Sequence, residues 1–494
     1  MLTTVPLASV AQIRDLERRA IAALDGDGFA LMQRAALAAW KHARIHFPAA
    51  RRWLVCCGTG NNGGDGYLFA RHAALAGVRV SVVRTGAPAT PDATRAADAC
   101  SVAGVPIRDF ESFEPAIADL VIDAILGIGL GDAPRGHAAS LIDAINAHGA
   151  PVFALDVPSG LDADLGSTAG SCVNATRTLT FIAQKPGLWT GAGRRVAGSV
   201  ALVDLDAGVI ADGDAESTTL LCGTAADALT ARPIDDHKGR RGRVLLIGGD
   251  HGMGGAIALA GEACARVGAG VTVIVTRREH VAALLARRPE LLVFGEDESN
   301  VELSQPVAAT LARADVVAIG PGLAQGAWGR RWMERVIGVE APRVFDADAL
   351  NLLSVDRVRL RANDVITPHP GEAARLLGCT TADVERDRAG AARGLVAAFG
   401  ATTVLKGAGT LIADPSGRLA VSPHAVPALA TGGSGDVLTG LIAGMLAQGL
   451  DAWDAACTAV LAHAECGLRA SALHGARGVL AGDLAAQLPA VLNR

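Results

Sequence analysis

The stretch ALATGGSGDVLTGLIAGMLAQG, at residues 428–449, constrains the fold more than any other part of the chain. Three glycines, Gly432, Gly433 and Gly435, precede Asp436, and about three helical turns of apolar or small residues follow it. Such a run is too long for a typical strand, so we expect a buried helix that begins at a tight glycine turn. The free N–H groups of its first turn suit phosphate oxygens. Asp436 at that end either takes a proton from a substrate hydroxyl or only caps the helix.

The composition is that of a globular protein with sizeable cores. A length of 494 residues predicts two or three domains. Because 50% of the residues are hydrophobic and only 19% are charged, these domains can bury sizeable cores. Aromatic residues make up only 3% and the net charge is -5, so neither base stacking nor a basic field favours a nucleic-acid partner. The short basic run HKGRRGR, at residues 237–243, is either a solvated loop or a phosphate contact.

Cysteine usage and hydropathy indicate the compartment. The nine cysteines form no CxxC pair and do not cluster with histidine, so we expect reduced thiols. The first residues lack the apolar region of a signal peptide, and no uncharged apolar run is long enough to span a bilayer. These patterns predict a cytoplasmic protein with no membrane partner.

Strand and helix patterns alternate in two separate series. The first begins at Arg52 with strand, glycine loop, helix and strand, and the second begins with RVLLIGG at residues 243–249. Between them lies the polar stretch ADGDAEST, at residues 211–218, our linker candidate. The sequence therefore predicts an α/β protein of two domains, residues 1–215 and 225–494. For the first we expect a parallel, doubly wound sheet, whose ligands bind beyond the carboxyl ends of the strands.

The first glycine loop, CGTGNNGGDG at residues 57–66, contains the spacing GxGxxG, which by itself is a weak dinucleotide signal. The next strand ends at Arg84, where a site for the ribose of NAD would carry an acid. Asp65 would also repel a pyrophosphate placed on the loop. A plain dinucleotide grip is therefore a poor fit.

Oxygen-bearing side chains follow this loop and two further predicted strands. Asn62, Asp123 and Ser159 could form an oxygen-only cage, which suits a hard cation and not zinc. Asp156 beside them is a candidate acid–base residue. The alternative is that all of them serve only in turns and helix caps.

The ordered motifs NNGGDG, DAILGIG, LDVPSGLDAD and TFIAQKPG resemble the NAD(P)H-hydrate epimerase domain, over roughly residues 8–210. The resemblance implies a Rossmann-like domain that binds hydrated NAD(P)H, with a potassium ion held by Asn62, Asp123 and Ser159. Lys185 is matched by motif without an assigned role, and Ala36 stands where we expect glycine. The residues implied to contact the hydrated dinucleotide are Asn61, Asn62, Gly63, Gly64, Asp65, Gly127, Ile128, Gly129, Leu130, Gly131, Asp132, Ala133 and Asp156.

The second half carries the parts of a phosphoryl-transfer enzyme. LKGAGT places Lys406 and a loop of small residues after a strand, where the ammonium can offset phosphate charge, although the order differs from a P-loop. GGDHGMGGA, at residues 248–256, is another glycine loop between a strand and a helix. TPHPGE brings His369, a site residue or a simple loop histidine, together with Glu372, which either helps to place magnesium or caps the following helix.

HKG, GGDHGMGGA, AIGPGL, DADALN, TPHPGE, LKG and GGSGD, in this order, resemble the ADP-dependent NAD(P)H-hydrate dehydratase of the ribokinase superfamily, over about residues 225–494. Ala324 stands where we expect glycine, and Asp250 and His251 replace the small hydroxyl residue expected in the first loop. The resemblance implies a hydrate site at Ala256, Gly322, His369 and Asp436, and an adenine-nucleotide site at Lys406, Gly407, Ala408, Gly409, Thr410 and Gly435.

Together these resemblances predict an isomerase and lyase that repairs damaged nicotinamide dinucleotides. The first domain would interconvert the R and S hydrates of NADH and NADPH with K+. The second would dehydrate the S form with ADP as co-substrate and Mg2+, giving AMP and phosphate, and we expect a homo-oligomer. The alternatives are a ribokinase-type small-molecule kinase with a dinucleotide-binding first domain, and a first domain that binds without catalysis.

Overall fold

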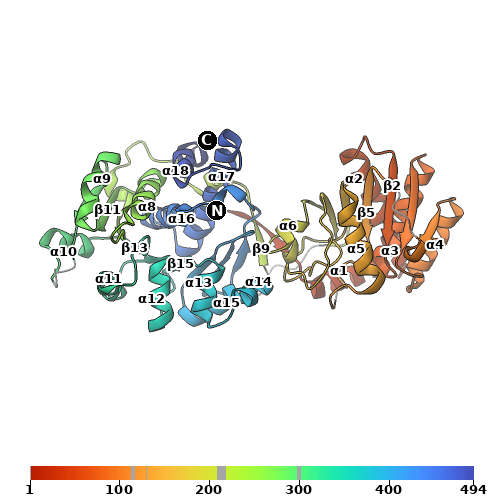
Figure 1. Cartoon of the computed structure of the whole chain (residues 1–494), viewed down its shortest axis with the longest axis horizontal. Coiled ribbons are helices and arrows are strands. Elements are labelled where there is room, and N and C mark those ends of the chain that lie inside the picture. The colour runs from red at the N-terminus through yellow and green to blue at the C-terminus, as the bar shows by residue number, and fades with distance from the viewer. Residues whose placement is uncertain (1, 113–116, 130, 209–217, 298–301, 494) are drawn as a thin grey trace. The chain divides into compact units, whose positions relative to one another are not determined.

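The computed structural model describes residues 2–112, 117–129, 131–208, 218–297 and 302–493, which form two compact units (Figure 1). One unit is Pro6–Thr218, and the other combines Met1–Val5 with Thr219–Arg494. Each unit has its own β-sheet and helices, so the predicted α/β class with two sheets is confirmed. Among the residues described, no helix is long and apolar enough to cross a membrane.

The first unit is built on a seven-stranded sheet whose paired strands run parallel, in the order β4-β3-β2-β5-β6-β7-β8. Its strands are β2 (Arg52–Cys57), β3 (Arg79–Arg84), β4 (Ile107–Asp109), β5 (Leu120–Ala124), β6 (Val152–Leu155), β7 (Arg177–Phe181) and β8 (Ser199–Val203). Its helices are α1 (Val10–Ala22), α2 (Gly28–His46), α3 (Asn61–Leu75), α4 (Pro91–Val102), α5 (Gly136–His148) and α6 (Gly193–Val196), with short 3-10 turns at Phe110–Ser112 and Pro186–Leu188.

Both faces of this sheet are covered because successive side chains of β2 point to opposite sides. Val55 and Cys57 pack into a core with α2, α3 and α4. Leu54 and Cys56 pack into a separate core with α5. Burial on both faces explains why the strand is a continuous apolar run, as is typical of parallel sheets.

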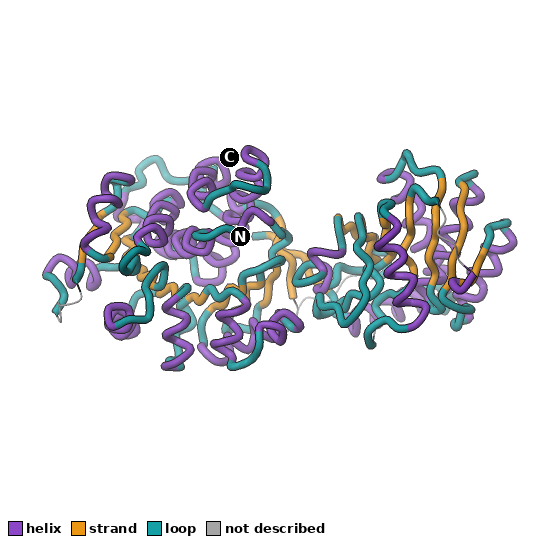
Figure 2. The backbone as a smooth tube through the Cα atoms, viewed as in Figure 1, coloured by secondary structure: helices purple, strands orange, loops and turns teal. Residues whose placement is uncertain are grey.

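The second unit has an 11-stranded sheet in the order β1-β9-β18-β17-β16-β15-β14-β13-β10-β11-β12, traced in orange in Figure 2. Pairs from β16 to β12 are parallel, whereas β17 and β18 join antiparallel. Its strands are β1 (Thr3–Leu7), β9 (Thr218–Cys222), β10 (Arg243–Ile247), β11 (Val271–Thr276), β12 (Leu292–Gly295), β13 (Val316–Ile319), β14 (Arg343–Phe345), β15 (Val365–Ile366), β16 (Thr402–Leu405), β17 (Leu411–Ala413) and β18 (Leu419–Val421).

The helices of the second unit cover this sheet and include the helix expected after the GGSGD turn, now α16. They are α7 (Ala225–Ala228), α8 (Gly254–Val267), α9 (Val281–Arg287), α10 (Gln305–Ala312), α11 (Ala327–Ile337), α12 (Asp348–Asp356), α13 (Pro370–Leu377), α14 (Thr381–Arg386), α15 (Arg388–Phe399), α16 (Ser434–Ala447), α17 (Ala452–His474) and α18 (Ala481–Leu492), with 3-10 turns at Lys238–Arg241, Arg278–His280 and Pro427–Leu429.

Helix α16 is buried nearly all round, as its sequence predicts, and packs against α8 in the core of the unit. The two helices approach closely because α16 carries glycine at the contact. A methyl group on Gly440 would come within 2.1 Å of the carbonyl oxygen of Ala260, a backbone clash that a side-chain rotation cannot relieve. This packing fixes the first turn of α16, and with it Asp436.

Candidate active sites

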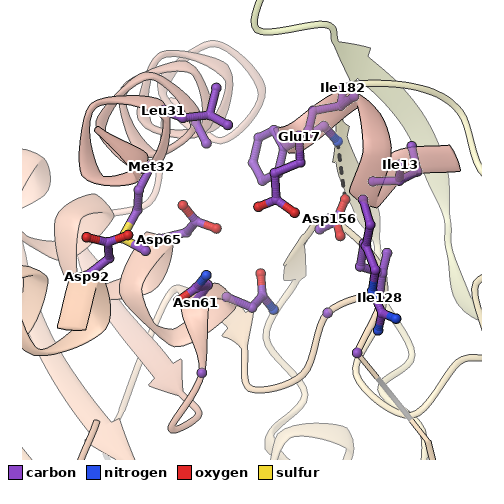
Figure 3. A pocket seen from close by; sticks show the side chains of 18 of the residues that line it. Ile13, Glu17, Leu31, Met32, Asn61, Asp65, Asp92, Ile128, Asp156 and Ile182 are labelled. Carbon is purple, nitrogen blue, oxygen red and sulfur yellow. Dashed lines mark hydrogen bonds between the residues drawn. The ribbon is translucent and has the colours of Figure 1, made fainter. Parts of the chain in front are cut away.

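In the parallel part of each sheet the strand order reverses at one place, and the glycine loops after β2 and β10 lie there. In the first unit β2 pairs with β3 on one side and β5 on the other, so the loops that follow β2 and β5 leave the sheet in opposite directions. Open α/β sheets bind their ligands at such points. A cavity of about 470 Å³ lies here, lined by both loops, by Asp156 after β6, and by α1 and α2 (Figure 3).

The glycines of the first loop allow backbone to touch backbone. A methyl group on Gly58 would lie 1.8 Å from the carbonyl oxygen of Ile125, and one on Gly63 would lie 2.1 Å from that of Gly58. The N-cap residue of α3 is Gly60, which has no side chain to accept a hydrogen bond from the amides of the first turn. The loop therefore brings the start of α3 against the end of β5.

The predicted oxygen cage is partly assembled. Ser159 donates from its backbone N to Asp123 Oδ2 (2.8 Å) and from Oγ to Asp123 Oδ1 (2.5 Å), and the Leu126 amide donates to Ser159 Oγ (2.8 Å). Burial raises the pKa of Asp123 to about 6, although the Ser159 hydrogen bonds oppose the rise. Asp123 thus also supports turns, as the alternative expected, since it accepts the amide of Ile125.

Asn62 supplies the strongest sign that this place receives a ligand. Both polar atoms of its side chain are buried, and neither has a hydrogen-bond partner among the residues that the structure describes. Leaving a buried amide unpaired costs about 1–3 kcal/mol, so a bound group is expected to satisfy it. Across the described residues, no three His, Cys, Asp or Glu side chains gather as metal ligands.

Asp156 is held in place by Lys185, the motif residue without an assigned role. The buried Lys185 ammonium donates to Asp156 Oδ1 at 2.6 Å, and also to Thr180 Oγ1 (2.8 Å) and the carbonyl of Phe181 (2.8 Å). Asp156 has a φ of 68°, a conformation that is uncommon outside glycine. A methyl group on Gly127 would lie 3.5 Å from Asp156 Oδ2, which places this oxygen beside the loop after β5.

The remaining residues expected at the hydrate site of the first unit divide into three groups. Asn61, Asn62, Asp65, Gly127, Ile128, Gly129 and Asp156 line the cavity. Gly63 and Gly64 are buried in the first turn of α3, and Gly131, Asp132 and Ala133 do not line the cavity. Leu130 lies outside the described residues.

Two acidic side chains line the cavity in ways that the sequence did not predict: Asp65 has a raised pKa, and Glu17 was not expected at the site. Burial and the negative charges of Asp156 and Glu17 raise the pKa of Asp65 well above its ordinary value. Glu17 of α1, which the motifs do not include, also lines the cavity. Its position on an amphipathic helix gave no signal of a functional role.

In the second unit the strand order reverses between β10 and β13. The loops after these strands pair through their backbones: Gly249 donates to the carbonyl of Pro321 (2.9 Å), and Asp250 donates to that of Gly322 (2.6 Å). A methyl group on Gly322 would come 3.3 Å from the Cβ of Ala256. The structure therefore brings together the two small residues expected to line the hydrate site.

Asp250, one of the two departures from the expected loop, is fixed by the buried Arg277. The guanidinium donates to Asp250 Oδ1 at 2.5 Å and lies over the ring of Trp328. The other departure, His251, contacts Glu279 at the surface. Ala324, where glycine was expected, has a φ of 56°, so the backbone there does adopt a conformation that favours glycine.

The ionisable centre of the second site is the buried Asp346 of the DADALN motif, whose role the sequence did not indicate. Asp346 accepts from Lys406 Nζ, Thr367 Oγ1 and Thr439 Oγ1, each at 2.8 Å. Burial opposes ionisation of Asp346, but the Lys406 charge and these hydrogen bonds outweigh it and lower the pKa. Lys406 Nζ also lies 3.8 Å from Glu372 Oε2, and these two carboxylates raise its pKa against the effect of burial.

Asp436, in the first turn of α16, lies close enough to this centre to respond to it. Its pKa is raised to about 7, first by burial and then by the charge of Asp346, with Lys406 in opposition. A methyl group on Gly435 would come 3.3 Å from Lys406 Nζ. The glycine turn, the lysine after β16 and the acid of α16 therefore meet at one place, and a carboxyl that titrates near neutrality is suited to act as a general base.

His369 and Glu372 cap α13, a role that was expected as an alternative for Glu372 and not for His369. His369 Nδ1 accepts from the amides of Gly371 (3.0 Å) and Glu372 (3.4 Å), while Glu372 Oε2 accepts from the amide of His369 (2.8 Å). Burial and the positive charges of Lys406 and Arg375 lower the pKa of His369. Its side chain is half exposed, and Nε2 lies 3.5 Å from Glu372 Oε1 while Nδ1 serves the cap.

The loop from Lys406 to Thr410 packs against the side chain of Arg388, a residue that no motif indicated. The fully buried guanidinium donates to the carbonyls of Leu405 (3.3 Å) and Lys406 (3.1 Å). Gly407, with a φ of 140°, packs against it, because a methyl group there would lie 2.8 Å from the guanidinium. Arg388 thereby holds the beginning of this loop in place.

Comparison with known proteins assigns each unit to a family. The family described as YjeF-related protein N-terminus matches residues 28–187, and the family described as NAD(P)H-hydrate dehydratase matches residues 244–490. The bifunctional NAD(P)H-hydrate repair enzyme Nnr of Escherichia coli (strain K12) is 43% identical over 486 residues, which are 97% of this chain and 93% of that protein.

Solved structures resemble the second unit. A ribokinase-like superfamily protein from Enterococcus faecalis V583 is 32% identical, covers 54% of this chain and 92% of its own, and superposes with a TM-score of 0.50. The ADP/ATP-dependent NAD(P)H-hydrate dehydratase from Bacillus subtilis, co-crystallized with ATP/Mg2+, is also 32% identical and covers 54% and 94%, with a TM-score of 0.48. The first of these confirms the predicted ribokinase-like fold.

Proposed function

Because this chain belongs to the family of bifunctional NAD(P)H-hydrate repair enzymes, we propose that its two sites carry out the two steps of that repair. The site after β2 and β5 interconverts the R and S hydrates of NADH and NADPH. The site at α16 dehydrates the S hydrate with ADP, giving the reduced dinucleotide, AMP and phosphate. We assign these activities to residues 1–215 and 225–494, with β1 as a structural part of the second sheet.

The observation that carries the dehydratase is the meeting of Lys406, Gly435 and Asp436. Hydroxide is a poor leaving group because the pKa of water is about 15.7, whereas the second pKa of a phosphate ester is about 6. Transfer of a phosphoryl group to the C6 hydroxyl lets the ring nitrogen expel phosphate, and loss of the C5 proton restores the dihydropyridine. Asp436 accepts the hydroxyl proton, and Lys406 with the turn amides offsets charge on the phosphates.

In this assignment the nucleotide lies along residues 406–410, in front of Arg388, and the hydrate lies between Ala256, Gly322 and His369. Mg2+ would accompany the nucleotide phosphates, because Asp346 is already occupied by three donors. Bound there, Mg2+ would neutralise phosphate charge.

For the epimerase we propose Asp156 as an acid–base residue, fixed by Lys185. Asn62, Asp123 and Ser159 would hold K+, and the unpaired amide of Asn62 is what supports this ligand set. Bound there, K+ would supply fixed positive charge beside the loop after β5. The reaction is reversible opening of the ring at C6 or reversible loss of water.

Location and assembly are part of the proposal. Nine unpaired cysteines suit a reducing compartment, and we propose the cytoplasm. We also propose a homo-oligomer, which sedimentation equilibrium would test.

A kinase and a dehydratase differ in their product. We would incubate the S hydrate of NADH with ADP and Mg2+ and analyse the products by phosphorus NMR and absorbance. Inorganic phosphate in equal amount to NADH is expected. A stable phosphate ester without recovery of NADH would favour the ribokinase-type alternative and overturn the proposal.

A further inference from the structure

Glu17 is a carboxyl group of the first cavity to which the proposed function gives no role. It lies on α1, one turn after Ile13, which together with Leu16 is buried in the core of the unit. Together with Ile13 and Arg14 it forms one wall of the cavity. Figure 3 shows its carboxylate projecting into the cavity, between Asp65 and Asp156 in this view.

The charges around Glu17 do not balance. Four carboxyl groups line the cavity, against two cationic groups; the carboxyl groups belong to Glu17, Asp65, Asp92 and Asp156, and the cations to Arg14 and Lys185. Lys185 forms its 2.6 Å ion pair with Asp156. Burial and the charge of Asp156 raise the pKa of Glu17, although Lys185 and Arg14 oppose this. Asp156 is thus the ion-paired acid of the cavity, and Glu17 is an acid that holds its proton more tightly than usual.

Inversion at C6 of the hydrate requires two proton-handling groups. The C6 carbon carries a hydroxyl and is bonded to the ring nitrogen, so it can open to an aldehyde. The hydroxyl proton leaves to a base, its electron pair forms the C=O bond, the C6–N1 bond breaks, and N1 keeps the bonding pair and takes a proton from an acid. Rotation about C5–C6 and the reverse steps on the other face of the aldehyde give the other epimer, with no net change in atoms or electrons.

We propose that Glu17 is the catalytic acid of the epimerase, which protonates N1 as the ring opens and recovers the proton as it closes, while Asp156 handles the hydroxyl proton. This inference rests on the proposed epimerase function. The cavity provides the two roles in distinct forms: an ion-paired carboxylate at the end of β6, and a partly buried carboxyl on α1 that has no ion pair within the described part of the chain. Asp65 lies on another element, α3, after its first turn and near the expected cation ligand Asn62.

The test compares Glu17→Gln with Asp15→Asn, a matched change on the exposed side of the same helix. An epimeric mixture of hydrated NADH with ADP, Mg2+ and K+ gives two phases of absorbance recovery: dehydration of the S hydrate, then recovery of the R hydrate at the rate of epimerisation. We expect Glu17→Gln to keep the first phase and to slow the second at least about 100-fold, after correction for spontaneous exchange. Asp15→Asn should keep both.

Two further results separate the outcomes. The rate of the wild-type second phase should fall as pH rises, because Glu17 loses its proton. The residual rate of Glu17→Gln should not show this fall at high pH. A Glu17→Gln variant that keeps more than about one tenth of the wild-type second phase would overturn the role of Glu17. A wild-type enzyme without an enzymatic second phase would instead overturn the proposed epimerase. The first phase reports only on the second unit, so denaturant unfolding of Glu17→Gln beside the wild type reports whether the first unit is intact.

Discussion

Replacing Asp436 by asparagine should remove dehydration and at the same time stabilise the second unit. The pKa of Asp436 is about 7 instead of 3.8, and each tenfold change in a protonation equilibrium is worth about 1.4 kcal/mol. Keeping this carboxylate charged therefore costs at most about 4 kcal/mol of folding stability, less what solvent access to the half-buried group recovers. Asparagine has nearly the same shape and no charge.

The sign of the effect depends on pH. Because the folded state binds the Asp436 proton more tightly than the unfolded state does, the wild-type protein loses stability as pH rises from about 4 through about 7. Asp436→Asn should therefore match the wild type at pH 4 and exceed it at pH 8. At about 2–4 °C per kcal/mol for a unit of this size, the gain in Tm at pH 8 should be several degrees.

The rate should fall while stability rises. Loss of a general base costs about 10²–10⁴-fold, so single-turnover dehydration of the S hydrate should slow by at least about 100-fold. The wild-type rate should drop about tenfold for each pH unit below about 7, and the residual rate of the variant should not. The assay pairs single-turnover absorbance with differential scanning calorimetry at both pH values. A variant with the wild-type rate would refute the base, and an unchanged Tm at pH 8 would refute the cost of burial.

Three other substitutions test local claims. Gly63→Ala should lose epimerase activity and destabilise the first unit by about 3 kcal/mol or more, because its methyl group would lie 2.1 Å from the carbonyl oxygen of Gly58. Gly60→Ala is the control, since a methyl group there meets open space and the variant should fold normally. Denaturant unfolding compares the stability of the two variants. Ala324→Gly should raise the stability of the second unit by about 1 kcal/mol by relieving a φ of 56°, and an unchanged or lower midpoint would contradict this. Asn62→Leu should abolish any difference in epimerase rate between KCl and NaCl, and a variant that keeps the wild-type preference for K+ would exclude Asn62 as a ligand.

Local patterns in the sequence were enough to predict the glycine turns, the buried helix α16 and the class of both sheets. Each of these depends on neighbours in the chain: glycine spacing, the length of an apolar run, and alternation of strands with helices. The meeting of Asp123 with Ser159 followed from the rule that loops at the carboxyl ends of parallel strands converge. The meeting of Ala256 with Gly322 was implied by the family resemblance alone.

What the sequence did not convey depends on contacts between distant segments. The sequence shows Lys185 only as a charged residue within a motif, whereas the structure shows that its ammonium donates a hydrogen bond to Asp156. Arg388 reads as a surface arginine on a helix, yet it is fully buried beneath the loop of Lys406. The pairing of β1 with the second sheet likewise joins the start of the chain to residues more than 200 positions away, which no periodicity reveals.

Recovery of reduced nicotinamide from an epimeric mixture of its hydrate tests the central claim, that one chain repairs both epimers. The wild-type protein would be incubated with the mixture, K+, Mg2+ and ADP, and the absorbance would be followed to its end point with spontaneous exchange subtracted. Full recovery, in a second phase faster than spontaneous exchange, is the predicted result. Recovery that stops at the S fraction would contradict an active epimerase, and no recovery at all would contradict the dehydratase.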